Sequence, residues 1–187
     1  MNTTTAAEAE DLWVFAYGSL MWRPDFEFLE RRPARVMGAH RALCVYSFVH
    51  RGTPEKPGLV LGLDQGGNCR GIVYRVAPAR RDETVAYLRA REQVTMVYRE
   101  CWRSVWIDDD PNKRVQALCY VVDRGHEQYA GRLGLTEQLH YVRQGHGRSG
   151  NNRDYVLATV KEIEAQGVRD PGLHRLADML KGAHEAS

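Results

Sequence analysis

The sequence has almost no surplus of charge of either sign. Its 26 lysine and arginine residues stand against 24 aspartate and glutamate residues, which gives a formal net charge of +2 over 187 residues. No long basic run occurs along the chain. Proteins that bind nucleic acids or anionic membranes concentrate positive charge on one segment or face. The sequence therefore argues against nucleic acid and against a membrane as partners.

Long hydrophobic runs are also missing. No segment approaches the roughly 20 apolar residues that span a bilayer, and residues 1–11 (MNTTTAAEAED) lack the basic start and apolar stretch of a signal peptide. We therefore expect a cytoplasmic protein. Because 43% of the residues are hydrophobic, the chain can form one core. We expect a single domain over residues 12–182, between a flexible N-terminal tail (1–11) and a C-terminal tail (183–187).

Cysteine pairs and metal-ligand spacings are absent. The cysteines are widely separated with no C-x-x-C pair, and the histidines never adopt a spacing such as H-E-x-x-H. We expect buried free thiols and no metal. The cysteines are Cys44, Cys69, Cys101 and Cys119.

Motifs of common hydrolases and nucleotide-binding proteins are missing as well. Neither Ser19 nor Ser149 lies in a G-x-S-x-G turn, so a hydrolase triad is unsupported. There is no G-x-x-x-x-G-K-[ST] sequence, and we expect no cofactor. The glycine-rich segment 145–152 precedes a helical pattern, so Ser149 or Asn151 is expected to cap a helix there.

The patterns that are present change along the chain, from strands in the first half to helices at the end. Strands are expected over residues 12–17, 35–48, 59–63, 71–76, 98–107 and 115–122, with a loop at 51–58 and turns at 64–68 and 108–112. Helices are expected at 82–93, 136–145, 150–166 and 172–181. This order predicts an α+β fold, with an antiparallel sheet curled toward a barrel and most helices late in the chain.

One acidic residue, Glu92, breaks two local rules. It follows Val85 and Leu88 on the apolar face of the expected helix, and it lies at the helix C-terminus, where the helix dipole disfavours negative charge. One interpretation is a carboxylate that reaches solvent or pairs with Arg89 or Arg91. The other is a partly desolvated acid with a raised pKa, suited to general acid–base catalysis.

The stretch VFAYGSL, residues 14–20, predicts a buried strand that ends at Gly18. Because glycine permits close approach, the backbone N–H groups of residues 18–20 can converge on one point, which would suit a carboxylate or phosphate oxygen. An ordinary strand end would have the same sequence.

Several motifs together resemble a known family. In chain order they are Trp13–Pro24 (WVFAYGSLMWRP), His50–Gly52 with Pro57-Gly58, Gly71–Tyr74 (GIVY), Arg91-Glu92, Tyr98, and the segment from Gly147 to Tyr155 (GRSGNNRDY). This set is similar to the ChaC family of glutathione-specific γ-glutamylcyclotransferases, in particular its bacterial-type members, from about residue 12 to residue 180.

The resemblance implies a small mixed β-barrel with surrounding helices, and a pocket where the Y-G-S-L loop meets the acid. It implies that the protein cleaves glutathione to 5-oxoproline and cysteinylglycine, with Glu92 as the catalytic residue. The strand end and loop would bind the γ-glutamyl group; these residues are Phe15, Ala16, Tyr17, Gly18, Ser19 and Leu20.

The resemblance adds three further candidates for substrate binding. Tyr98 matches a family tyrosine near the substrate, although a core aromatic would have the same pattern. Arg51 would suit a carboxylate at the far end of glutathione, or it is a solvated loop residue. Tyr129 lies in a segment similar to a Tyr-x-Gly pocket segment, although an ordinary loop aromatic would look the same. We expect a small-molecule substrate, glutathione, and a monomer or weak dimer.

Two segments depart from the family pattern. Many members have Gly-Gly-Tyr after the glutamate and Asn-Pro before Tyr-x-Gly, whereas this chain has Gln93–Tyr98 (QVTMVY) and Gly125–Gln128 (GHEQ). A cyclotransferase for another γ-glutamyl peptide or a γ-glutamylamine therefore stays open, as does a non-catalytic carboxylate-binding module. Glu92 argues against the module, because a nearby carboxylate weakens the binding of an anion.

Overall fold

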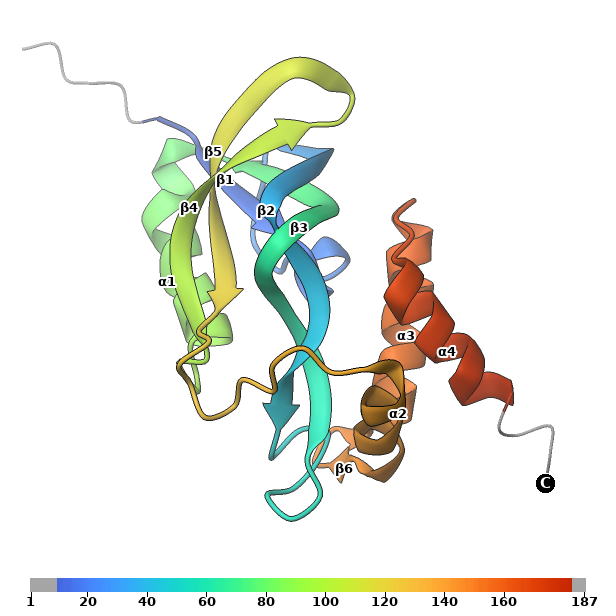
Figure 1. Ribbon diagram of the computed structural model, residues 1–187. Helices are drawn as coiled ribbons and strands as arrows, with labels where there is room; N and C mark the ends of the chain where they lie inside the picture. Colours follow the sequence, from blue (N-terminus) through green and yellow to red (C-terminus); the bar gives the residue numbers. More distant parts are fainter. Residues whose placement is uncertain (1–9, 183–187) are drawn as a thin grey trace, which may run out of the picture.

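Five strands close into a barrel in the computed structural model, which describes residues 10–182 (Figure 1). The strand order around the barrel is β1-β3-β2-β4-β5, and β1 pairs with β5 in parallel while the other neighbours are antiparallel. The predicted small mixed barrel is therefore confirmed. The strands are β1 (Leu12–Ala16), β2 (Glu30–Ser47), β3 (Gly58–Val76), β4 (Tyr98–Ile107) and β5 (Asp110–Val122).

The long ribbon of β2 and β3 corrects one prediction. The separate strands expected at 59–63 and 71–76 are parts of the single strand β3, and the turn expected at 64–68 does not form. Gly66 and Gly67 have φ of +99° and +71°, and they are accommodated as an irregularity opposite Gly38, where the pairing moves from Met37↔Asn68 to Ala39↔Gln65. The sequence pattern was typical of a turn, but pairing with β2 on both sides carries the strand through.

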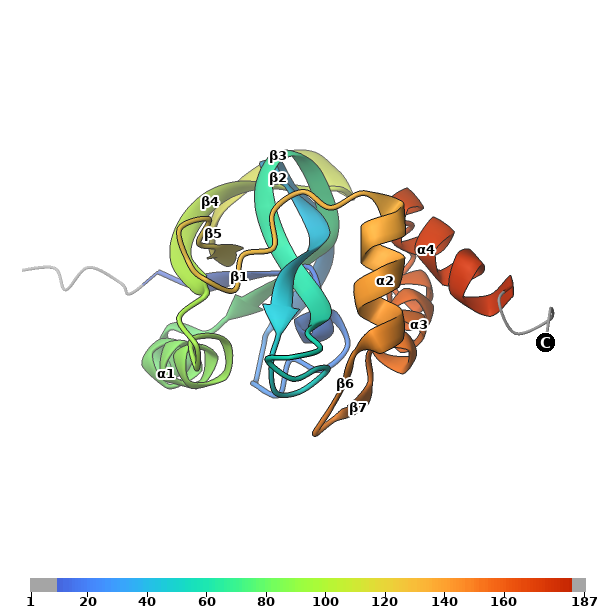
Figure 2. The same ribbon diagram turned by 60° about the horizontal axis from the view of Figure 1, so that its bottom comes forward.

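Helices cover two sides of the barrel. In both ribbon views α1 lies on one side, and the other three helices pack together on the opposite side of the β2–β3 ribbon (Figures 1 and 2). All four predicted helices are present, with ends that differ by at most two residues from the expectation. They are α1 (Arg81–Glu92), α2 (Leu135–Gln144), α3 (Asn152–Ala165) and α4 (Pro171–Gly182).

Three short features were missed or misjudged. The β4–β5 connection is a turn at 108–109, so β5 begins earlier than predicted. A two-residue hairpin, β6 (His146–Gly147) with β7 (Gly150–Asn151), precedes α3. Asn151 stands at the N-cap of α3 but makes no capping hydrogen bond, because its Oδ1 lies 2.6 Å from His146 Nδ1 instead.

Two large apolar clusters make up most of the core, and a third, small one contains Cys44, Val45, Val97 and Val122. One large cluster takes residues from all five barrel strands and fills the barrel; it includes Phe15, Ala34, Val73, Val105 and Ala117. The other joins the outside of β1 to the helices and includes Leu12, Val14, Leu88, Val156 and Leu176. Strand β1 is buried on both faces, which explains its continuous apolar sequence.

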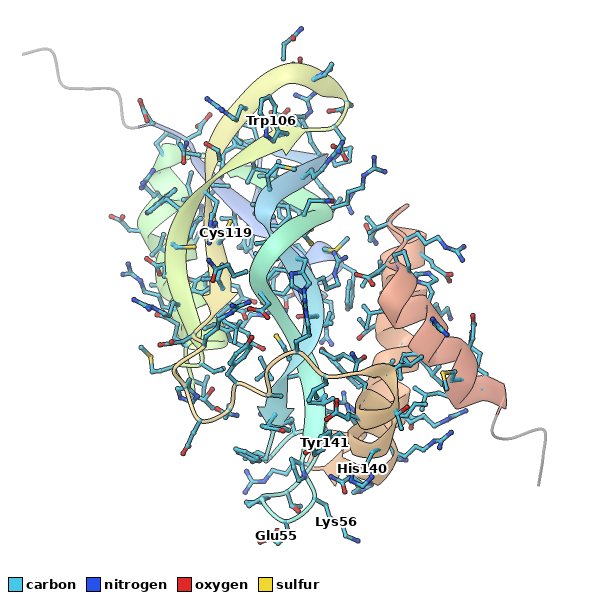
Figure 3. All side chains as sticks on the ribbon, in the orientation of Figure 1. Glu55, Lys56, Trp106, Cys119, His140 and Tyr141 are labelled. Carbon is cyan, nitrogen blue, oxygen red and sulfur yellow. The ribbon has the colours of Figure 1, made fainter. Side chains whose placement is uncertain are left out.

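The cysteine prediction is confirmed for three of the four residues. Cys44, Cys69 and Cys119, the last marked on β5 in Figure 3, are buried free thiols, while Cys101 is half-buried. Burial raises the pKa of the Cys44 thiol to about 12 and that of Cys69 to about 11, so neither is a thiolate near neutral pH.

Most of the two expected tails, 1–11 and 183–187, lies outside the described residues. Of these tails only Glu10 and Asp11 are described, and the Asp11 carboxylate is 2.9 Å from Arg75 Nη1. No helix among residues 10–182 combines the length and apolar character that crossing a membrane requires. Within the same residues, no three His, Cys, Asp or Glu side chains are grouped so that they could hold a metal ion.

Candidate active site

A cavity of about 110 Å³ lies where the end of β1 meets the end of α1. Every barrel strand except β2 contributes to its wall, together with the loop after β1, the last residue of α1 and the first turn of α3. Its lining residues are Phe15, Tyr17, Gly18, Ser19, Leu20, Val60, Leu61, Glu92, Tyr98, Tyr120 and Tyr155. The loop and the acid that were singled out separately in the sequence therefore share one cavity.

Glu92 is the last residue of α1, and its side chain is 18% exposed. Burial raises the pKa of the Glu92 carboxyl above its ordinary value, and the guanidinium of Arg91 opposes the rise, with its Nε 3.3 Å from Oε1. Arg89 instead pairs with Glu100. Both interpretations of Glu92 therefore apply in part: burial raises its pKa, and of the two arginines considered it is Arg91 that lies beside the carboxylate.

Four tyrosine side chains surround the cavity. Burial raises the pKa of the Tyr17 and Tyr98 hydroxyls well above the ordinary value, and it also raises those of Tyr120 and Tyr155. Each hydroxyl therefore keeps its proton at neutral pH. The cavity thus combines one carboxyl group with neutral groups that can donate or accept hydrogen bonds.

Two of these tyrosines bind the two backbone polar groups of one β3 residue, Leu61. The Tyr98 hydroxyl donates to the Leu61 carbonyl at 2.6 Å, and the Tyr155 hydroxyl accepts from the Leu61 N–H at 3.1 Å. Tyr98 has committed its proton and offers only acceptor capacity to a ligand, whereas Tyr155 accepts from Leu61 and does not give its proton to the β3 backbone. The Thr159 side chain is a second partner of the Tyr155 hydroxyl. The two hydroxyls are therefore chemically different.

The loop after β1 forms a 3₁₀ turn at Ser19–Met21. Its backbone hydrogen bonds begin with the Met21 N–H, which donates to the Gly18 carbonyl at 2.9 Å. The N–H groups of Gly18, Ser19 and Leu20 precede this bond, and such a turn contains no acceptor for them. Among residues 10–182 none of these three groups donates a hydrogen bond, and all three residues line the cavity.

Buried side chains hold this loop from behind. Arg41 Nε donates to the Tyr17 carbonyl at 2.5 Å, and the Tyr74 hydroxyl lies 2.9 and 2.8 Å from the carbonyls of Leu20 and Met21. With its carbonyl groups occupied, the loop is a fixed part of the wall.

Three predicted site residues lie outside the cavity lining. Ala16 is fully buried in the core. Arg51 Nη1 donates to the carbonyl oxygens of Ser149 (2.5 Å) and Asn151 (3.4 Å), and its guanidinium lies over the Tyr155 ring.

The third predicted site residue outside the cavity lining is Tyr129, whose hydroxyl donates to Asp64 Oδ2 at 2.9 Å. The structure therefore brings Phe15, Tyr17–Leu20, Glu92 and Tyr98 together in the cavity wall, and Ala16, Arg51 and Tyr129 are not part of that wall.

Sequence reasoning missed four lining residues. Tyr155 lies inside the GRSGNNRDY motif, so the resemblance contained a signal for it. Tyr120 follows the alternation of β5, but nothing in its sequence distinguishes it from a core aromatic. Val60 and Leu61 are ordinary apolar strand residues, and only the folded ribbon places them here.

Solved structures share this fold. A yeast γ-glutamyl cyclotransferase specific to glutathione superposes with a TM-score of 0.78 over 93% of this chain and 99% of that chain, at 23% identity. Another structure, named as a γ-glutamyl cyclotransferase, gives a TM-score of 0.52 over 89% of this chain and 86% of its own, at 13% identity. The barrel and its helices thus define the γ-glutamylcyclotransferase fold class.

The sequence comparison is more specific. The family model described as ChaC-like protein matches residues 12–183, and the chain belongs to this family. The glutathione-specific γ-glutamylcyclotransferase of Escherichia coli K12 is 31% identical over 170 residues, which cover 91% of this chain and 73% of the relative. The human glutathione-specific γ-glutamylcyclotransferase 1 is 32% identical over 172 residues, 91% of this chain and 78% of that protein.

Proposed function

We propose that this protein cleaves glutathione to 5-oxoproline and cysteinylglycine. The observation that carries the proposal is the buried carboxyl group of Glu92, with its raised pKa, in one cavity with the free N–H groups of the Gly18–Leu20 loop. Family membership supports it, because the E. coli and human relatives are named for this activity.

A single carboxyl group can serve both proton transfers. The α-ammonium of the γ-glutamyl group gives a proton to the Glu92 carboxylate, and the freed nitrogen attacks the γ-carbonyl carbon to close a five-membered ring. When the tetrahedral intermediate collapses, the bond to the cysteinyl nitrogen breaks, and the protonated Glu92 returns the proton to that nitrogen. The ring nitrogen still carries one extra proton, which passes through the Glu92 carboxylate to the released amine, so that 5-oxoproline is neutral at its lactam nitrogen and cysteinylglycine leaves as an ammonium ion. The raised pKa of Glu92 lies closer to neutral pH than the ordinary pKa of a glutamate. The carboxyl group can therefore both accept and return a proton efficiently near neutral pH.

The remaining lining groups would position the substrate. The N–H groups of Gly18, Ser19 and Leu20 would bind an oxygen of the γ-glutamyl group, either its α-carboxylate or the developing oxyanion. Tyr155 would donate a hydrogen bond to the substrate, and Tyr98 would accept one. Holding the flexible chain curled for ring closure supplies much of the rate advantage. Arg51 would act indirectly, through its contact with the Tyr155 ring.

The test is mass-spectrometric detection of both products after purified protein is mixed with glutathione. We expect the Glu92→Gln variant to lose about 100-fold to 10,000-fold in kcat/KM while it stays folded. Glu83→Gln is the matched control, because it makes the same change at an exposed position in the first turn of α1. Equal activity of Glu92→Gln and wild type would remove Glu92 as the proton carrier.

Other outcomes separate the remaining alternatives. If the wild type leaves glutathione intact but cyclises another γ-glutamyl peptide or a γ-glutamylamine, the reaction class stands and the substrate assignment is wrong. Binding of glutathione without turnover would indicate a non-catalytic module. A cytoplasmic location and a monomeric or weakly dimeric state stay predictions, to be checked by fractionation and light scattering.

A further inference from the structure

The side chain of Arg91 joins the end of α1 to the loop that lines the cavity. Its Nη2 donates to Ser19 Oγ at 2.8 Å, and its Nη1 donates to the Arg23 carbonyl at 2.7 Å and to the Tyr87 hydroxyl at 2.8 Å. Its Nε lies 3.3 Å from the Glu92 carboxylate. One guanidinium therefore contacts the loop, the segment that follows it, the helix and the acid.

The neighbouring arginine on the same helix provides a contrast. Arg89 lies two residues earlier, has the same charge, and places its guanidinium on Glu100 of β4 with two hydrogen bonds of 2.8 Å. It contacts neither the loop nor Glu92 in any hydrogen bond or ion pair among residues 10–182. A difference between variants at these two positions therefore reports the contacts of Arg91.

The geometry of this contact has a specific consequence for ring closure. The loop offers N–H groups to the substrate and Glu92 exchanges protons with it, so the distance between loop and acid fixes how the substrate lies. A planar guanidinium with several N–H donors can hold several partners at fixed positions. We propose, on the basis of the proposed function, that Arg91 is a positioning residue that keeps the Glu92 carboxylate and the Tyr17–Leu20 loop in register for cyclisation.

Arg91 also supplies the positive charge next to Glu92. The other titratable groups that face this carboxyl are Tyr17 from the loop, Tyr98 from β4, Tyr120 from β5 and Tyr155 from α3, and all are neutral because burial raises their pKa values.

On its far side, the Arg91 guanidinium lies 3.6 Å from the Asp25 carboxylate. Because the Arg91 charge lowers the pKa of Glu92, loss of that charge raises this pKa further. The acid limb of the pH–rate profile then moves to higher pH.

Three variants separate the charge from the hydrogen bonds. We expect Arg91→Gln to lower kcat/KM about 10-fold to 100-fold, mainly through kcat, and to move the acid limb to higher pH. Arg91→Lys keeps the charge without the planar guanidinium, so its acid limb should stay near that of the wild type while kcat/KM stays lower by about tenfold. Arg89→Gln should change kcat/KM by less than about twofold.

A double-mutant cycle tests the contact to the loop directly. Because Ser19 Oγ accepts from Arg91, the loss in the Ser19→Ala, Arg91→Gln double variant should be smaller than the product of the two single losses. Independent losses that multiply, or an Arg91→Gln variant that matches Arg89→Gln in rate and pH profile, would overturn the proposal. An inactive wild type would instead refute the proposed function, so the two failures are distinguishable.

Discussion

The residue Glu92 combines three features that disfavour a carboxylate. It is mostly buried, it ends a helix, and it is surrounded by neutral tyrosines. Arg91 compensates only in part, because the pKa of Glu92 stays above its ordinary value. Sites where local rules are broken without full compensation are commonly functional sites.

This arrangement predicts that Glu92 ionisation destabilises the fold. Because the folded-state pKa is raised above the ordinary value near 4.5, the folded protein binds this proton more tightly than the unfolded chain does. The destabilisation is therefore absent below that ordinary value and fully present once pH exceeds the raised pKa. We expect Glu92→Gln to be more stable than the wild type at about pH 8, with a difference that disappears toward about pH 4.

Urea unfolding of both proteins across this range is the measurement, and Glu83→Gln is the control for loss of a surface charge on the same helix. A Glu92→Gln variant that is less stable than the wild type at the higher pH would show that the carboxylate is well solvated or paired, contrary to its position in the structure.

Among the elements, α3 is attached to β3 by two side chains one turn apart. Asn152 is fully buried; its Oδ1 accepts from the Leu59 N–H and its Nδ2 donates to the Leu59 carbonyl, both at 2.7 Å. Tyr155 makes the equivalent contact with the Leu61 N–H. Residues three apart on α3 thus reach residues two apart on β3, because each pair lies on one face of its element.

Asn152→Ala should therefore be strongly destabilising. The substitution leaves the N–H and carbonyl of Leu59 without partners in a buried place, which costs about 2 to 4 kcal/mol in the free energy of unfolding. Chemical denaturation measures this loss. Asn151→Ala is the neighbouring control, since Asn151 is exposed and contacts only His146 through its side chain. Similar losses in the two variants would contradict the role of Asn152.

The same elements show how far the sequence could predict the fold. Strand β4 and the four helices follow from hydrophobic periodicity, and they were predicted because each is a continuous pattern. Strand β3 was divided wrongly because Gly66 and Gly67 are typical of a turn, and only the pairing with β2 outweighs that preference. The same limit applies to the cavity, since Leu61 and Tyr120 line it through pairing across the barrel.

For the molecule as a whole, one buried ion pair connects the helical layer to the loop at the cavity. The Arg41 side chain is 3% exposed, and its Nη1 lies 3.4 Å from the carboxylate of Asp170, the residue just before α4. Its Nε and Nη2 donate to the carbonyls of Tyr17 and Arg70. The Arg41 guanidinium therefore connects Asp170, next to α4, with the backbone of β3 and of the loop at the cavity.

Asp170→Asn tests this connection. The substitution leaves the Arg41 charge buried without its carboxylate, so we expect a loss of about 1 to 3 kcal/mol in stability and a higher KM for glutathione. Thermal unfolding and steady-state kinetics measure the two effects. Asp178→Asn, at an exposed position on α4, should change neither. A stable variant with an unchanged KM would show that the ion pair does not support the loop.

The link through Arg41 also bears on shortened forms of the chain. Proteolytic clipping, or a premature stop codon, before Asp170 would remove α4 and its buried face of Leu173, Leu176 and Leu180. It would also remove the carboxylate that pairs with Arg41, the side chain that donates to the Tyr17 carbonyl. Such a fragment would keep Glu92 and every residue that lines the cavity, yet Arg41, one of the side chains that hold the loop, would be left without its counter-charge. We therefore expect glutathione turnover to be impaired by damage at the far end of the polypeptide.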